Sequence, residues 1–372
     1  MRTYLSWLAV LILTACSTPY SPAVLVKGSA PFEGIGGLLE RSSSVDVVMV
    51  HGMCTHTSED ARNAMKEIVR ALQGNFRPPP LGPQSIKVPE VPAVEIVREE
   101  AEVAGSTIRF YGLVWSGMTK PLKDQLLYDS TGIANDCSSA EPGTCKPVRA
   151  ALNGKFKDSL LNDCLADALA YQGKSSVPIR DAMVTALTQV VLEQDSTEPL
   201  VVVSASLGSK IVFDALSQMS GSKGPNGHVL TRRALDQIER RLAIVFMEAN
   251  QLPILSLADQ DIRQIDASTS SASPVVGLLK PLEQLARARS SRQSELSVVA
   301  FTDPNDLLSY RLFGSRFVGL DRIRIADVVV SNSPTLAGQL ENPSAAHLGY
   351  ARNKDVARMI ACGAPNLSTR CK

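Results

Sequence analysis

The stretch "VVVSASLGSK", Val201–Lys210, decides the fold that this sequence predicts. Three consecutive valines are typical of a strand that is buried on both faces of a parallel sheet. A Ser-x-Ser-x-Gly motif centred on Ser206 follows them, and apolar residues at helical spacing follow the motif. The stretch therefore predicts a strand that passes through a tight turn into a helix, with Ser206 at the turn.

Strands and helices alternate along the chain on both sides of this stretch. Apolar runs predict further strands in "VDVVMV" before His51, in a hairpin whose second arm is Thr107–Trp115, and in "LAIVFMEA", "LSVVAFTD" and "IRIADVVV". Apolar residues at helical spacing predict a helix that Ser58 caps, and others near 179–191, 207–219, 231–241 and 353–361. This alternation predicts the α/β class: a mostly parallel central sheet with helices on both faces.

The N-terminal stretch "MRTYLSWLAVLILTAC" has the pattern of an export signal. One arginine precedes an apolar run that is too short to anchor the chain across a bilayer. "LTAC", Leu13–Cys16, resembles the lipobox of bacterial lipoproteins, which implies a signal peptide at 1–15 and acyl chains such as palmitate on Cys16. The resemblance implies a membrane attachment in the cell envelope, and Ser17 favours the outer membrane, facing the periplasm. A plain signal peptide with a chance cysteine is the alternative.

The composition of the chain is typical of a globular protein. Residues 16–43 are rich in Ser, Pro and Gly, which predicts a tether with one short strand at Ala23–Lys27, followed by a domain over 44–372. The 372 residues are 44% hydrophobic and 20% charged, as in globular proteins. A formal net charge of +1 gives no reason to expect a nucleic-acid partner, and 5% aromatic residues do not indicate a stacking platform.

The cysteine count is consistent with export to an oxidising compartment. Of the seven cysteines, six remain once Cys16 is set aside, which is an even number. Two pairs, Cys137–Cys145 and Cys362–Cys371, flank short turn-rich loops that a disulfide could close, which leaves Cys54–Cys164 as the third pair. Other pairings and free buried thiols stay open, because spacing does not settle connectivity. The chain has no C-x-x-C motif and its four histidines are scattered, so it does not indicate a metal site.

Candidate catalytic side chains follow four of the predicted strands. His51-Gly52-Met53 follows "VDVVMV", Ser206 follows the valine strand, "TDPNDLLSY" closes the "LSVVAF" strand, and a loop with His347 comes after "IRIADVVV". In an open α/β sheet, ligands bind outside the carboxyl ends of the strands. A serine hydroxyl needs a base to become a nucleophile, and His347, in a loop before the last helix, is the best candidate.

The order Ser206, aspartate, His347 resembles that of the α/β-hydrolase family over about residues 44–365, with insertions at about 116–175 and 253–295. The resemblance implies that Ser206 is the nucleophile, His347 the base and Asp306 the acid that orients it, with Asp303 as the alternative acid. The motif departs from the family pattern at Ser204, where a glycine is usual. Ser204 is small enough to substitute, and Gly208 keeps the second small position.

His51-Gly52 resembles the oxyanion loop of the same family. The resemblance implies that the backbone N–H groups of Met53 and Leu207 bind the oxyanion. His51 itself is expected to hold its own loop in place.

These resemblances imply a membrane-anchored serine hydrolase that cleaves carboxylic esters, lipid esters among them, through an acyl-enzyme intermediate. No metal or organic cofactor is implied, and the partners expected are an acyl ester or lipid substrate and the membrane. An acyltransferase or amidase with the same triad is one alternative. A non-catalytic envelope lipoprotein with a hydrolase fold is the other.

Overall fold

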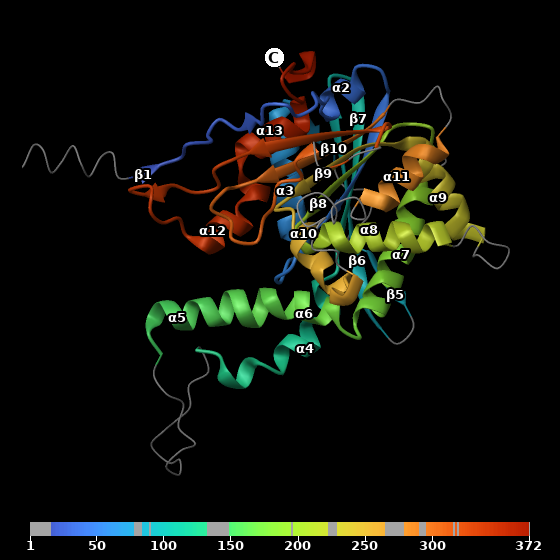
Figure 1. Ribbon diagram of the computed structural model, residues 1–372. Helices are drawn as coiled ribbons and strands as arrows, with labels where there is room; N and C mark the ends of the chain where they lie inside the picture. The colour runs from blue at the N-terminus through green and yellow to red at the C-terminus, as the bar shows by residue number, and fades with distance from the viewer. Residues whose placement is uncertain are drawn as a thin grey trace, which may run out of the picture.

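The computed structural model describes residues 16–77, 84–88, 91–131, 149–194, 196–221, 229–264, 279–289, 295–314, 317 and 320–371 (Figure 1). The signal peptide expected at 1–15 and the pair Cys137–Cys145 lie outside these residues. The expected disulfides Cys54–Cys164 and Cys362–Cys371 are both present. No helix in the described part of the chain is long and apolar enough to cross a bilayer.

A ten-stranded sheet forms the centre of the described structure, in the order β2-β11-β10-β9-β8-β3-β7-β6-β4, with β5 also paired to β6. Its strands are β2 (Val24–Leu25), β3 (Ser44–Val50), β4 (Asn75–Phe76), β5 (Gln84–Val88), β6 (Val91–Val103), β7 (Ser106–Val114), β8 (Leu200–Ala205), β9 (Leu242–Glu248), β10 (Leu296–Thr302) and β11 (Ile323–Val329). The strands from β11 to β7 run parallel to one another, and antiparallel strands close both edges. The mostly parallel α/β sheet expected from the sequence is thus confirmed.

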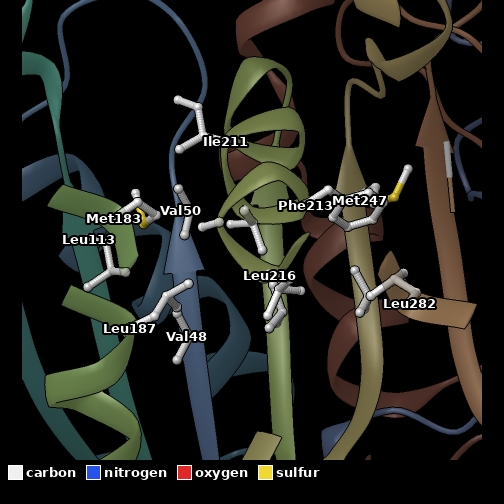
Figure 2. Close-up of a cluster of buried hydrophobic side chains, with 14 of the residues drawn as sticks. Val48, Val50, Leu113, Met183, Leu187, Ile211, Phe213, Leu216, Met247 and Leu282 are labelled. Atoms are coloured by element: carbon white, nitrogen blue, oxygen red, sulfur yellow. The ribbon is translucent and has the colours of Figure 1, made fainter. Parts of the chain in front are cut away.

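The apolar faces of the strands are covered by two layers of helices. One layer contains α2 (Ile35–Leu39), α3 (Ser58–Ala71) and α13 (Lys354–Cys362), and the other contains α7 (Ser176–Glu193), α8 (Leu207–Gly221), α9 (Val229–Arg241) and α11 (Lys280–Ala288). Side chains alternate along β8, so Val201 and Val203 face the first layer and Val202 faces the second. Figure 2 shows the second layer, where Met183, Leu187 and Leu216 pack against the sheet.

A helical excursion projects from the sheet between β7 and α7. It contains α4 (Lys120–Asp124), α5 (Ala151–Phe156), the π-helical segment η3 (Lys157–Leu165) and α6 (Ala166–Gln172) (Figure 1). It occupies the predicted insertion at 116–175. The Cys54–Cys164 disulfide joins η3 to the loop that follows β3. The excursion is therefore covalently attached to the carboxyl end of the sheet.

The segment after β9 is only partly an insertion. It begins with α10 (Leu252–Leu255) and two single-turn 3-10 helices at 256–259 and 262–264, and it ends in α11. Leu282 and Leu285 of α11 are fully buried in the main core. The expected insertion at 253–295 therefore contributes a core helix, because α11 presents one apolar face to the sheet layer.

The structure corrects two local expectations. The short strand expected at Ala23–Lys27 is present as β2, which pairs antiparallel with β11. Residues 16–43 are nevertheless not a tether throughout, because Ile35 and Leu38 of α2 are fully buried. The sequence did not predict this burial because the apolar residues of this segment are interspersed with Ser, Pro and Gly. The cap of α3 is Thr57 and not Ser58, since the Thr57 hydroxyl accepts the Asp60 N–H and the Asp60 carboxylate accepts the Thr57 N–H.

Three further short elements, β1, β12 and α12, lie outside the main sheet. The strand β1 (Cys16–Ser17) pairs antiparallel with β12 (Thr335–Leu336) outside the main sheet. The helix α12 (Pro343–Leu348) follows β12 and carries His347. The expectation that His347 lies in a loop is therefore wrong, because Asn342 caps a short helix by accepting the N–H groups of Ser344 and Ala345.

Candidate active site

Ser206 lies at a strained turn between β8 and α8. Strand β8 ends at Ala205, helix α8 begins at Leu207, and the φ angle of Ser206 is +51°. Left-handed backbone at a residue with a side chain costs on the order of 1–3 kcal/mol and is found where the surrounding structure enforces it. Here the Ser206 N–H donates a 2.7 Å hydrogen bond to the carbonyl oxygen of Glu248 on β9. The turn fixes the direction of the serine hydroxyl.

Two glycines allow the turn to approach the loop after β3. A Cβ on Gly52 would lie 2.6 Å from Cβ of Ser206, and a Cβ on Gly208 would collide with the carbonyl oxygens of Val50 and His51. Both positions therefore need glycine because no side chain fits. The turn and the loop therefore approach each other closely at Gly52 and Gly208.

Two neighbouring serines, Ser204 in the motif and Ser209 just after it, are structural. Their hydroxyl oxygens lie 2.9 Å apart, and Ser204 also donates to the carbonyl oxygen of Phe246 at 3.3 Å. Ser204 and Ser209 are fully buried. A serine is therefore accommodated at 204 because Ser209 and the neighbouring strand satisfy its hydroxyl group.

The structure brings Ser206, His347 and Asp306 together. The Ser206 Oγ lies 3.2 Å from Nε2 of His347, and Nδ1 of His347 lies 2.9 and 3.0 Å from the two carboxylate oxygens of Asp306. All three residues are at most 5% exposed. Ser206 lies between β8 and α8, Asp306 lies in the loop after β10, and His347 lies on α12. The tertiary fold therefore assembles a hydroxyl–imidazole–carboxylate chain.

Asp303 has a different environment from Asp306. Its carboxylate accepts the N–H groups of Asn305 at 2.9 Å and Asn332 at 2.6 Å, and its carbonyl oxygen accepts the Asp306 N–H. Burial raises the pKa of Asp303 to about 6. Asp303 therefore builds the turn that presents Asp306, as the Asp-Pro-Asn-Asp sequence predicts.

Tyr350 is a positioning residue that sequence reasoning missed. Its hydroxyl group donates to an Asp306 carboxylate oxygen at 3.1 Å and accepts the Asp303 N–H at 2.7 Å. The Leu308 N–H donates to the other Asp306 oxygen at 3.0 Å. Each Asp306 oxygen thus has a second partner besides the imidazole, which fixes the carboxylate plane. The only signal in the sequence was a tyrosine three residues after His347.

His51 holds the loop after β3, as expected. Its Nδ1–H donates to the carbonyl oxygen of Gly52 at 2.8 Å, its Nε2 accepts the Trp115 N–H at 2.9 Å, and its ring stacks on the Trp115 ring. Burial lowers the pKa of His51 well below its usual value, so the ring is neutral and can accept at Nε2. This bonding leaves His51 no free nitrogen for acid–base chemistry.

The amide groups expected to bind an oxyanion have no hydrogen-bond partner among the described residues. Among the described residues no hydrogen bond uses the N–H of Met53 or Leu207, and both residues are at most 3% exposed. The next amide, that of Cys54, donates to Asp167 at 2.8 Å with its φ angle at +78°. Two buried N–H groups without partners near a serine hydroxyl have the composition of an oxyanion hole.

The helical excursion also fixes this loop through charges. The Thr55 N–H and hydroxyl group donate to Asp163, and the Lys123 ammonium lies 2.8 Å from Asp163 and 3.3 Å from Asp167. Burial raises the pKa of Asp167, whereas Lys123 and Thr55 lower that of Asp163 despite its partial burial. The loop after β3 is therefore held by a disulfide and by a half-buried ionic cluster.

A cavity of about 420 Å³ lies beside the triad. Its wall includes Ala205 and Leu348, the chain neighbours of Ser206 and His347, and one buried acidic residue, Glu248. Burial alone raises the pKa of Glu248 to about 7. Sequence reasoning missed Glu248 because an acid at the end of an apolar strand has no motif around it.

One group of potential metal ligands occurs among the described residues: Cys54, Asp163 and Cys164. The two cysteines are joined to each other in a disulfide, so their sulfurs are not available as thiolate ligands.

Comparison of the chain with protein-family models and with curated proteins found no match. The site must therefore be interpreted from its own geometry.

Proposed function

We propose that this protein is a serine hydrolase with an α/β-hydrolase fold that cleaves carboxylic esters through an acyl-enzyme. The observation that carries the proposal is the continuous contact from Ser206 through His347 to Asp306 at a strained strand-to-helix turn. The order of these residues along the chain and their positions after β8, β10 and β11 support the same family. Gly52 and Gly208 support it further, because they permit the close packing that the turn requires.

The chemistry follows from the geometry of the three side chains. His347 Nε2 takes the Ser206 proton as the hydroxyl oxygen attacks the ester carbonyl, while Asp306 keeps the Nδ1–H tautomer and stabilises the imidazolium. The N–H groups of Met53 and Leu207 stabilise the negative oxygen of the tetrahedral intermediate. The imidazolium then protonates the leaving alcohol, and water repeats the sequence to release the acid.

The substrate is proposed to be an acyl ester from a membrane environment. The proposed lipid on Cys16 would hold the enzyme at a membrane surface, since each buried methylene contributes about 0.8 kcal/mol. Strand β1, which begins at Cys16, pairs with β12, and β12 leads into the helix that carries His347. An anchor at Cys16 would therefore be attached next to the segment that completes the triad.

A fluorophosphonate probe and a series of 4-nitrophenyl esters of increasing acyl length test the activity. The wild-type protein should be labelled at Ser206 and should hydrolyse at least one ester. The Ser206→Ala variant should lose labelling and at least about 10⁴-fold in kcat, because triad residues act as a unit. Ser209→Ala is the matched control, since Ser209 lies three residues after Ser206 but bonds only structurally, and it should keep its labelling. Equal labelling of wild type and Ser206→Ala would refute the assignment.

A further inference from the structure

Glu248 is a buried carboxyl group that the proposed mechanism does not use. It is the last residue of β9 and is 7% exposed. Among the described residues no hydrogen bond or ion pair involves its carboxyl group, and burial is the only cause of its raised pKa. The Glu248 oxygens are not among the fully enclosed unpaired polar atoms of the described residues, so the group opens onto a cavity in which its ionised form is disfavoured unless a partner enters.

The carboxyl group lies in the cavity beside Ser206. Ile244 and Phe246 on β9 face the helix layer of α3 and α13, and Glu248 is next in that alternation, so it points to the same face. Its strand neighbour in register is Ala205, and its carbonyl oxygen accepts the Ser206 N–H. Glu248 is therefore adjacent to the nucleophile through the backbone, and its side chain lines the cavity.

The other charged side chains of the cavity wall are Asp60, Asp163 and Arg352. Asp163 is paired with Lys123, and Asp60 accepts two hydrogen bonds from Thr57 and is stabilised by Arg352. The wall also contains apolar residues, among them Met49, Ala61, Val203 and Leu348, beside polar ones such as His56 and Asn63. A ligand in the cavity therefore meets aliphatic side chains and one acid, Glu248, that has no partner among the described residues.

We propose that Glu248 binds a protonated amino group of the substrate, so that the preferred substrates are esters with an amine a few bonds from the scissile carbonyl. An ammonium group neutralises the buried carboxylate and donates hydrogen bonds to it, whereas a hydroxyl group would leave the negative charge uncompensated. The short aliphatic segment between the amine and the carbonyl would pack against the apolar walls. This inference rests on the proposed function, because it takes Ser206 as the attacking group.

A binding measurement separates this inference from catalysis. In the Ser206→Ala protein, hexylammonium should raise the melting temperature at pH 8, and hexan-1-ol at the same concentration should not. The Ser206→Ala/Glu248→Gln protein should lose the response to hexylammonium, because glutamine keeps the shape and removes the charge. An equal response of the two proteins to hexylammonium, or an equal response of the first protein to the amine and the alcohol, would overturn the proposal.

Hydrolysis then tests the substrate preference. The wild-type protein should have a kcat/KM for 4-nitrophenyl 6-aminohexanoate at least about tenfold above that for the equally long heptanoate. Glu248→Gln should remove this preference, so that the ratio of the two kcat/KM values falls to about one. A variant that loses both activities equally would show a structural role and overturn the inference. If neither ester is cleaved and Ser206 is not labelled by fluorophosphonate, the proposed function fails while the binding result still stands by itself.

Discussion

At Ser206 the reactivity of a common side chain depends on its backbone and its neighbours. The hydroxyl group is 3.2 Å from the His347 Nε2, and the left-handed turn holds it there. Ser204 and Ser209 have the same chemistry but bond to each other in the core. The proposed nucleophile therefore differs from the two structural serines in its position, two or three residues away along the chain.

The two aspartates of the turn after β10 are expected to respond differently to substitution. Asp306→Asn should lower kcat by about 10³ to 10⁴-fold, because an amide stabilises the wrong histidine tautomer. Asp303→Asn should cost much less activity, since Asp303 contacts backbone N–H groups and not His347. Steady-state kinetics of both purified variants on one ester decides between them. A more severe loss in Asp303→Asn would mean that Asp303 is the acid.

Glu248 should make stability depend on pH. A glutamate in the unfolded chain ionises near pH 4.5, but in the folded protein burial raises the pKa of Glu248 to about 7. Between these values the folded protein holds a proton that the unfolded chain releases, so the free energy of unfolding falls as pH rises through this window. The full loss is about 3 kcal/mol, from a difference of roughly 2.5 pKa units.

Glu248→Gln removes this titration. A comparison of the variant with the wild-type protein therefore separates the effect of Glu248 on stability from that of the other titrating groups. Relative to wild type, the variant should gain stability between pH 4.5 and pH 8, as measured by urea unfolding at both values. A difference between the two proteins that is the same at both pH values would show that Glu248 does not titrate in this window.

At the scale of elements, the loop after β3 and the helical excursion form one unit. The Cys54–Cys164 disulfide, the Cys54 N–H to Asp167 hydrogen bond and the Lys123 cluster all join them. Met53 lies directly before Cys54, so the peptide group expected to bind the oxyanion is fixed by the excursion. An excursion that would look dispensable in the sequence therefore supports the active site.

Removal of this disulfide should lower activity as well as stability. Cys54→Ser/Cys164→Ser should lower the free energy of unfolding by roughly 2–4 kcal/mol and reduce kcat, because the loop is freed. The control is Cys362→Ser/Cys371→Ser, which removes a disulfide at the C-terminus and should lower the melting temperature with kcat unchanged. Equal kcat values in the two double variants would contradict the role of the excursion in the loop.

At the scale of the whole molecule, the parallel sheet decides where the site forms. Its carboxyl edge collects the loop after β3, the turn after β8, the aspartate turn after β10 and the segment after β11. The N-terminal segment reaches the same region, because β1 pairs with β12 and the Ser17 and Thr335 hydroxyl oxygens lie 2.8 Å apart. An attachment at Cys16 would therefore orient this part of the molecule relative to the membrane.

Cys16→Ser should abolish the proposed lipid attachment. We expect the variant to remain an unprocessed precursor or to be released as soluble protein, whereas the wild type should fractionate with membranes and incorporate labelled palmitate. Ser17→Ala is the matched control, because it changes the neighbouring residue and keeps the cysteine. Membrane fractionation and palmitate incorporation that persist in Cys16→Ser would exclude this anchor.

Most of the secondary structure was predictable because its signals are local. The strand "VDVVMV", the hairpin at Ala104-Gly105 and the helices that follow have periodic patterns that each element carries within itself. The exceptions are two short helices: α2 has five residues, two of them glycines, and α12 has six residues around His347. Helices this short obtain their stability from tertiary contacts, so their own sequence predicts them poorly.

For the site, the sequence determined which residues are candidates and in what order they follow strands, because the motif at Ser206 and the positions of Asp306 and His347 are linear features. Only the tertiary structure decided that Asp306 and not Asp303 faces the imidazole, that Tyr350 holds that carboxylate, and that Glu248 lines the cavity without a partner among the described residues. These facts depend on contacts between residues that are distant in the chain. Their energies arise from burial and hydrogen-bond geometry, which exist only once the sheet has assembled.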